Sequence, residues 1–88
     1  MRVHQLKSWP KFFQPLSEGI RTHELRRNDR LYRVGDRLQL NEFDPETHVY
    51  TGRVLHLAVT SMTSYEEPCA VSKEAIDEKF CILSVRLL

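Results

Sequence analysis

Two stretches of strict alternation between apolar and polar residues constrain the fold of this chain more than any other feature. In residues 53–62 the side chains of Leu55, Leu57 and Val59 fall on one face, and residues 80–87 repeat the pattern. A period of two residues is typical of a half-buried β-strand. Further segments with a weaker form of this period are residues 2–7, 21–27 and 37–43. The sequence therefore predicts five strands.

One amphipathic helix is expected between the first two strands. Ser8 is a suitable N-cap, and Pro10 suits the first helical turn. Gly19 suits the C-terminal end, whereas Pro15 removes a backbone donor and predicts a kink. The apolar stripe of this helix consists of Trp9, Phe12, Phe13, Leu16 and Ile20, and the first four are expected to dock it.

Short strands with one early helix favour a small, mostly antiparallel β-barrel, because closure protects the edges of a sheet. The 88 residues are expected to form a single domain, 1–88. Residues 44–47 predict a turn, and Gly52 is expected to close the loop that follows it. Residues 63–78 are expected to be a long loop with a helical turn from Ser72 to Ile76.

Several classes of protein do not fit the sequence. The longest mainly apolar stretch, residues 80–88, has nine residues and contains Arg86, whereas a membrane-spanning helix needs about 20. No secretory signal is visible, so a cytoplasmic location is expected. Cys69 and Cys81 are then expected to be reduced thiols, with one disulfide as the alternative. The histidines lack the spacing of a zinc site, so neither a metal nor a cofactor is expected.

The charges are segregated along the chain. Residues 1–37 hold nine basic and four acidic residues, whereas residues 38–88 hold four basic and eight acidic ones. A segregated positive half attracts phosphate even when the net charge is only +1. The alternative is that folding mixes these charges over a solvated surface.

The most informative segment is residues 19–26. After a glycine ends the helix, the strand presents Glu24 and Arg26 on the same face because they are two residues apart. An arginine that is held by a carboxylate is a rigid fork of donors, suited to a phosphate or to the edge of a base. A plain structural ion pair on a half-buried strand is the alternative.

This segment resembles the signature of the ASCH domain, G-x-K-x-x-E-x-R, with Gly19, Arg21, Glu24 and Arg26 at its four positions. The later run 34–40, Val-Gly-Asp-Arg-Leu-Gln-Leu, resembles the second motif of that family. More closely, the chain is similar to short phage and bacterial ASCH-related proteins of unknown function. The segments that carry this likeness are His4–Lys7, Trp9–Pro10 with Phe13, Glu24–Arg30, Glu42–Thr47 and Tyr50–Arg53.

The resemblance implies a PUA-like β-barrel of about five to six strands with one N-terminal helix. It also implies a cleft between helix and barrel, lined by the signature residues, that binds RNA or modified nucleosides. Arg21 stands where the signature has lysine, and arginine is always protonated and cannot act as a general base. The related acetylcytidine amidohydrolases use a lysine and a threonine on this strand and a glutamate further on. Arg21 and Glu24 stand at the corresponding positions here, so no catalytic residue is assigned.

The leading hypothesis is a nucleic-acid-binding module without catalysis, with RNA as the expected ligand. One alternative is a hydrolase or nuclease acting on RNA or a modified nucleoside through Lys7, Arg21, Thr22 and Glu24. Another is a phage or mobile-element protein that binds a host protein through its acidic second half. The residues expected to bind nucleic acid are Lys7, Arg21, Glu24, Arg26, Arg27, Arg30 and Arg33, with Trp9 and Tyr32 as stacking candidates.

Overall fold

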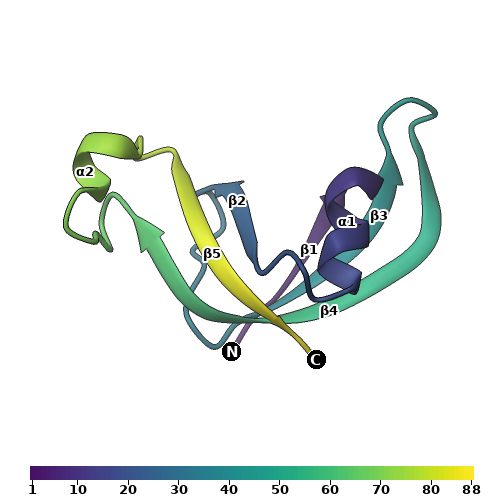
Figure 1. Cartoon of the computed structure of the whole chain (residues 1–88), viewed down its shortest axis with the longest axis horizontal. Coiled ribbons are helices and arrows are strands. Elements are labelled where there is room, and N and C mark those ends of the chain that lie inside the picture. The colour runs from purple at the N-terminus through teal and green to yellow at the C-terminus, as the bar shows by residue number, and fades with distance from the viewer.

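Five strands form where the alternation predicts them, and they pair into one curled sheet (Figure 1). The computed structural model describes all residues, 1–88. Neither of its two helices has the length and apolar character needed to cross a membrane. In chain order the elements are β1 (Val3–Ser8), α1 (Pro10–Ser17), β2 (His23–Arg27), β3 (Arg37–Asp44), β4 (Val49–Ser64), α2 (Ser72–Ala75) and β5 (Phe80–Leu87).

The order of strands in the sheet is β1-β3-β4-β5-β2. β1 runs parallel to β3, and the other three pairings are antiparallel. The sheet curls into a half-barrel, and α1 lies within its concave side (Figure 1). The prediction of a mainly β domain with five strands and an early helix is confirmed. β1 and β2 are the two edges of the sheet, and no backbone ladder joins them.

The core fills the concave side of the sheet. The apolar members of the alternating strands point inward, as Leu38 and Leu40 of β3 and Leu57 and Val59 of β4 illustrate. Burial of such side chains is the main favourable term in folding. The whole cluster of buried residues comprises Leu6, Phe13, Leu16, Tyr32, Leu38, Leu40, Leu57, Val59, Cys81, Leu83 and Val85.

The apolar stripe of α1 is only partly used for docking. Phe13 and Leu16 are buried, but Trp9 is 51% exposed and Ile20 is 76% exposed. The expectation that Trp9 docks the helix is therefore wrong. The reason is that α1 has only eight residues, so Trp9 precedes the helix and Ile20 follows it. Trp9 instead stacks on Phe12, with 6.3 Å between ring centroids.

The N-terminal end of α1 differs from the prediction, whereas its C-terminal end agrees with it. Trp9, rather than Ser8, is the N-cap residue, and Ser8 is the last residue of β1 with its side chain turned inward. At the other end Gly19 has a φ of 73°, its N–H donates to the Leu16 carbonyl, and the N–H of Ile20 donates to the Pro15 carbonyl. This bonding pattern is a Schellman motif. The residue at the position of Gly19 in such a motif has a left-handed backbone, which glycine adopts without strain.

Gly52 lies within β4 and does not end the preceding loop. Asn41 pairs with Val54 and Phe43 pairs with Tyr50, so three residues of β4 oppose one residue of β3. Gly52 sits in this bulge with a φ of 93°. Bulges of this kind bend a strand and increase its twist. β4 therefore begins at Val49, earlier than the predicted start at residue 53.

A buried hydrogen bond between a histidine and a carboxylate ties β1 to the turn that precedes β3. Nε2 of His4 donates to Oδ2 of Asp36 over 2.9 Å, and the backbone N–H groups of Arg2 and Arg33 also donate to this carboxylate. Burial would raise the pKa of Asp36, but the hydrogen bonds it accepts outweigh burial and hold that pKa below its usual value. The ring of Tyr32 covers His4 with 4.7 Å between centroids.

We predict that Asp36→Asn lowers the free energy of unfolding by about 1.5–3 kcal/mol at neutral pH, because charged hydrogen bonds are lost. The folded-state pKa of Asp36 is lowered, so its contribution is complete above the ordinary value of 3.8 and disappears as the pH falls through the folded-state pKa. Urea unfolding across this pH range measures the effect. The difference between wild type and variant should shrink in acid, and a constant difference would contradict this account. Asp29→Asn, at an exposed ion pair, is the control and should have little effect.

Candidate functional site

The two edges of the sheet are bridged by arginine side chains. Nη2 of Arg26, on β2, donates to the carbonyl of Lys7 on β1 over 2.9 Å. Nη1 of Arg30, just beyond β2, donates to the carbonyl of Gln5 over 3.4 Å. We call this line between β1 and β2 the seam. Side chains, rather than a backbone ladder, complete the curl of the sheet there.

Glu24 fixes Arg26 from the other side. Oε2 of Glu24 accepts a hydrogen bond of 2.7 Å from Nε of Arg26. The two residues share the inward face of β2 because they are two positions apart. Glu24 is only 4% exposed. A charged hydrogen bond to a buried carboxylate is strong and directional, so the Arg26 guanidinium is held in one orientation.

A pocket of about 510 Å³ lies beside this pair, where the end of β1, the start of α1 and β2 meet. We call it the Glu24 pocket. Two of its lining residues have buried polar atoms without a hydrogen-bond partner, namely Oγ of Ser8 and Nε of Arg21. The Arg21 guanidinium lies 4.9 Å from the centroid of the Phe12 ring. The pocket is lined by Lys7, Ser8, Trp9, Phe12, Arg21, Glu24, Leu25 and Arg26.

The strand register explains why the inside of the sheet becomes polar at this end. Along β1 the inward positions are His4, Leu6 and Ser8, and Ser8 pairs with Glu42 of β3. Glu42 is buried and accepts a hydrogen bond of 2.7 Å from Oγ1 of Thr51. Sequence reasoning missed Ser8 and Glu42 as members of this region. The alternation Leu38, Leu40, Glu42 was the signal that could have found Glu42.

A second pocket of about 390 Å³ continues along the seam. We call it the arginine pocket. It shares Leu25 and Arg26 with the Glu24 pocket, so the two are neighbours along β2. The guanidinium of Arg27 lies 5.9 Å from the centroid of the Phe80 ring. The pocket is lined by Leu6, Leu25, Arg26, Arg27, Asp29, Arg30, Tyr32 and Phe80.

The structure brings most of the predicted site residues together. Lys7, Trp9, Arg21, Glu24 and Arg26 line the Glu24 pocket. Arg27 and Arg30 join Arg26 in the arginine pocket. Tyr32 also lines the arginine pocket, so eight of the nine predicted residues lie along the seam.

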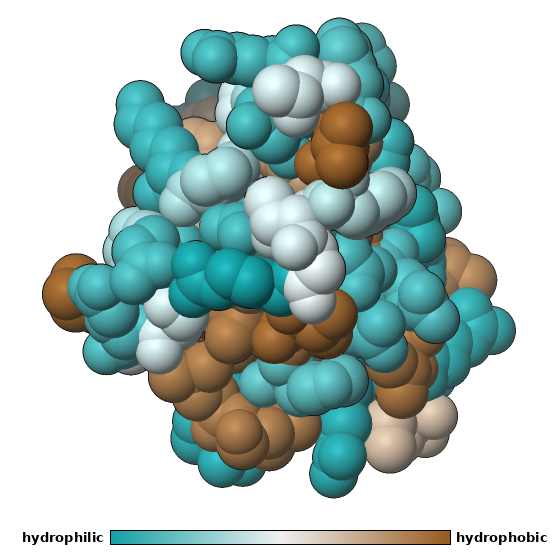
Figure 2. All heavy atoms as spheres, turned by 90° about the vertical axis from the view of Figure 1, so that its right-hand side faces the viewer, coloured by the Kyte–Doolittle hydropathy of each residue, from teal (hydrophilic) through white to brown (hydrophobic).

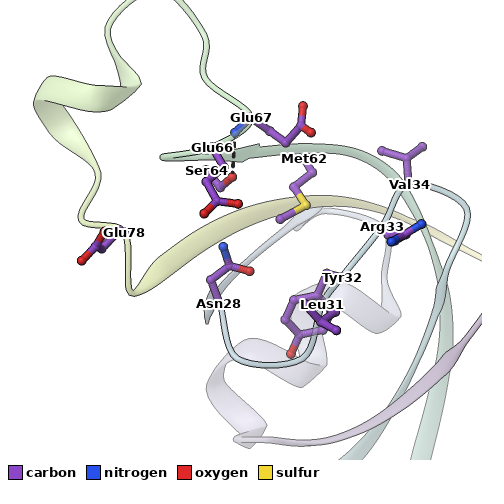
Figure 3. A pocket seen from close by; sticks show the side chains of 10 residues that line it. All are labelled: Asn28, Leu31, Tyr32, Arg33, Val34, Met62, Ser64, Glu66, Glu67 and Glu78. Atoms are coloured by element: carbon purple, nitrogen blue, oxygen red, sulfur yellow. Dashed lines mark hydrogen bonds between the residues drawn. The ribbon is translucent and has the colours of Figure 1, made fainter.

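Tyr32 and Arg33 do not take the predicted places. Tyr32 is 5% exposed, and burial raises its pKa to about 12 although Arg26 and Arg30 oppose this rise. Its ring is therefore covered and cannot stack on a base. Arg33 lines a separate cavity of about 680 Å³ together with Glu66 and Glu67 (Figure 3).

That cavity adjoins the arginine pocket, because Tyr32 lines both, but it has the opposite charge to the seam. Figure 3 shows three glutamates around it, Glu66, Glu67 and Glu78, with the backbone N–H of Glu67 donating to Oγ of Ser64. Carboxylates repel phosphate, so this cavity does not extend the basic surface. The segregation of charge along the sequence is thus partly retained in space.

Thr22, a candidate of the catalytic alternative, does not accompany Glu24 in its pocket. Thr22 is exposed and lines a smaller cavity of about 260 Å³ with Leu87 and Arg86. Lys7 does line the Glu24 pocket, but its Nζ lies over the ring of Phe43, 4.4 Å from the centroid. The lysine, threonine and glutamate of that alternative therefore do not converge.

Comparison with known proteins gives a family without a known function. The family model described as a domain of unknown function (DUF3850) matches residues 3–85. An uncharacterised 12.9 kDa protein in the GpA 3′ region of Escherichia phage P2 is 33% identical over 66 residues. The matched region covers 75% of this chain and 59% of the phage protein, so the chain spans less than two thirds of that relative.

We predict that Arg26→Ala lowers the free energy of unfolding by about 1–3 kcal/mol, because it leaves the Glu24 carboxylate buried without its partner. Thermal or urea unfolding measures this loss. The double variant Glu24→Gln with Arg26→Ala should lose less than the sum of the two single variants, because each single change breaks the same contact. Arg27→Ala, at the next, exposed position of β2, is the control and should be close to wild type. Additive losses would show that Glu24 and Arg26 are not coupled.

Proposed function

We propose that this chain, which belongs to the DUF3850 family of domains of unknown function, is a nucleic-acid-binding module that holds single-stranded RNA along its seam. The observation that carries this proposal is the pair of adjoining pockets. Five basic side chains line them, and only Glu24 and Asp29 oppose these charges. The five are Lys7, Arg21, Arg26, Arg27 and Arg30.

The arginine pocket has the chemistry of a phosphate site. Guanidinium groups donate in a planar fork that matches the oxygens of a phosphate, and they stay charged at every physiological pH. Arg27 and Arg30 are exposed, and Arg26 is held in place by Glu24 and by the Lys7 carbonyl. Contacts of this kind position a nucleic-acid backbone without reading its sequence.

The Glu24 pocket has the chemistry of a site for one unpaired base. Trp9 is half-exposed at its rim, and aromatic side chains stack on bases that are not paired. Ser8 Oγ and Arg21 Nε lack hydrogen-bond partners in the wall of this pocket, and a polar base edge that displaced the wall slightly would satisfy them. Oε1 of Glu24 accepts no hydrogen bond within the protein, which leaves one carboxylate oxygen to accept from a ligand.

A relation to the ASCH domain is part of this proposal. The signature residues Arg21, Glu24 and Arg26 line one pocket between helix and sheet, which is the arrangement that the resemblance implies. The curled, mainly β sheet with an early helix is compatible with a PUA-like barrel. In this account Glu24 holds an arginine and does not act on a substrate.

We predict that a single-stranded oligonucleotide quenches the fluorescence of Trp9, which is the only tryptophan in the chain. Affinity should fall as salt rises, because phosphate contacts release counterions. Arg26→Ala should weaken binding by about 1–3 kcal/mol, and Arg30→Ala should reduce the salt slope by about one. Lys73→Ala removes the same charge from α2, away from the seam, and is the matched control. Binding that is absent at low salt, or indifferent to salt, contradicts the proposal.

We also predict no turnover when the protein is incubated with acetylcytidine or with a mixed RNA pool. Arg21 cannot act as a base, and Thr22 lies outside the Glu24 pocket. Product analysis by chromatography is the measurement. Turnover that disappears in Glu24→Gln, while binding persists, would overturn this prediction in favour of the hydrolase or nuclease alternative.

A further inference from the structure

An aromatic pair close to the turn of the β3–β4 hairpin does not belong to the core. Phe43 and Tyr50 face each other across the two strands, with 5.1 Å between ring centroids. Tyr50 is 52% exposed, and neither ring belongs to the buried cluster. The hairpin projects beyond α1 at one end of the molecule (Figure 1). Their mutual packing stabilises the hairpin but leaves much of the Tyr50 ring in solvent.

Lys7 connects this pair to the seam. Its Nζ lies 4.4 Å from the centroid of the Phe43 ring and 6.0 Å from that of Tyr50. The same side chain lines the Glu24 pocket, and its backbone carbonyl accepts the hydrogen bond from Arg26. The aromatic pair and the Glu24 pocket therefore share a basic residue. Glu24 is the only acidic residue that lines this pocket.

The surroundings of the hairpin favour a nucleic-acid strand over an apolar protein partner. Figure 2 shows the face of the molecule on the hairpin side. Hydrophilic side chains dominate its upper part, where the turn of the hairpin lies, and apolar ones gather below. An apolar partner needs a contiguous apolar patch. A single exposed ring beside a lysine instead suits one base and its phosphate.

We propose that Phe43 and Tyr50 form a second stacking subsite, in which Tyr50 stacks on an unpaired base and Lys7 contacts the phosphate between this base and the one in the Glu24 pocket. This inference rests on the proposed function and extends it. It makes the ligand a single strand of at least two nucleotides rather than a free nucleoside or a duplex. A duplex keeps its bases stacked on one another and presents none of them to Tyr50.

The test compares ligands of different length on the full chain. Wild type and Tyr50→Leu are titrated with a mononucleotide, a dinucleotide and oligonucleotides of about four and about eight nucleotides, a range covered by small β-barrel binders. Trp9 fluorescence reports occupancy of the Glu24 pocket in each case. Leucine keeps an apolar side chain opposite Phe43 but removes the flat ring. Tyr65→Leu is the matched control, because Tyr65 is also exposed and also lies beside a lysine, Lys73, but near α2.

We expect the affinity of wild type to rise with length. Tyr50→Leu should lower the affinity for the longest ligand about fivefold to 150-fold, the range of base–aromatic stacking, and leave the affinity for the mononucleotide unchanged. Tyr50→Phe and Tyr65→Leu should behave as wild type. If Tyr50→Leu binds the longest ligand as tightly as wild type, or loses mononucleotide and octamer affinity equally, the second subsite is overturned while the pocket stands. If no ligand quenches Trp9 in the wild type, the proposed function fails and the subsite fails with it.

Discussion

The hydrogen bonds of Arg26 are the interaction on which the site depends. One side chain joins a buried carboxylate on its own strand to a backbone carbonyl on the opposite edge of the sheet. A curled sheet of five strands has two edges, and edges that stay open invite pairing with other chains. Here the two edges are close enough for an arginine to span. The exposed Arg27 lies on β2, and the exposed Arg30 lies just beyond it. Charged side chains on an edge strand oppose such pairing. The same placement gathers positive charge where the pockets form.

The curl of the sheet also decides which end of its interior is apolar. Along β1 the inward row runs from His4 through Leu6 to Ser8, and its partners on β3 run from Leu38 through Leu40 to Glu42. The middle of each row belongs to the core, whereas both rows end in polar residues, Ser8 and Glu42. α1 fills the concave side with Phe13 and Leu16 but is too short to cover this region. The Glu24 pocket is therefore a consequence of a short helix inside a deeply curled sheet.

The strands and the Glu24–Arg26 pair could be predicted because both follow from a period of two residues, which is a local property. The places where prediction failed depend on contacts between distant segments. Trp9 fits a helical stripe, but it precedes the first turn of the helix. The stripe therefore predicted a buried side chain at a position that is exposed. Gly52 looks like the end of a loop, but the pairing of β3 with β4 makes it the centre of a bulge. Tyr32 stands in a polar, turn-rich stretch, and only the position of His4 from the other end of the fold explains its burial.

The unpartnered atoms beside the Glu24 pocket support the proposal that this pocket binds a ligand. A buried polar atom without a partner costs about 1–3 kcal/mol, and this domain is too small to hold a large reserve of stability. Ser8 Oγ and Arg21 Nε both carry this cost, and they do so beside the same pocket. Alanine at position 8 or an apolar residue at position 21 would remove it without disturbing the core cluster. Under the proposed function this cost has a physical role, because a base that displaced the pocket wall would supply the missing hydrogen-bond partners.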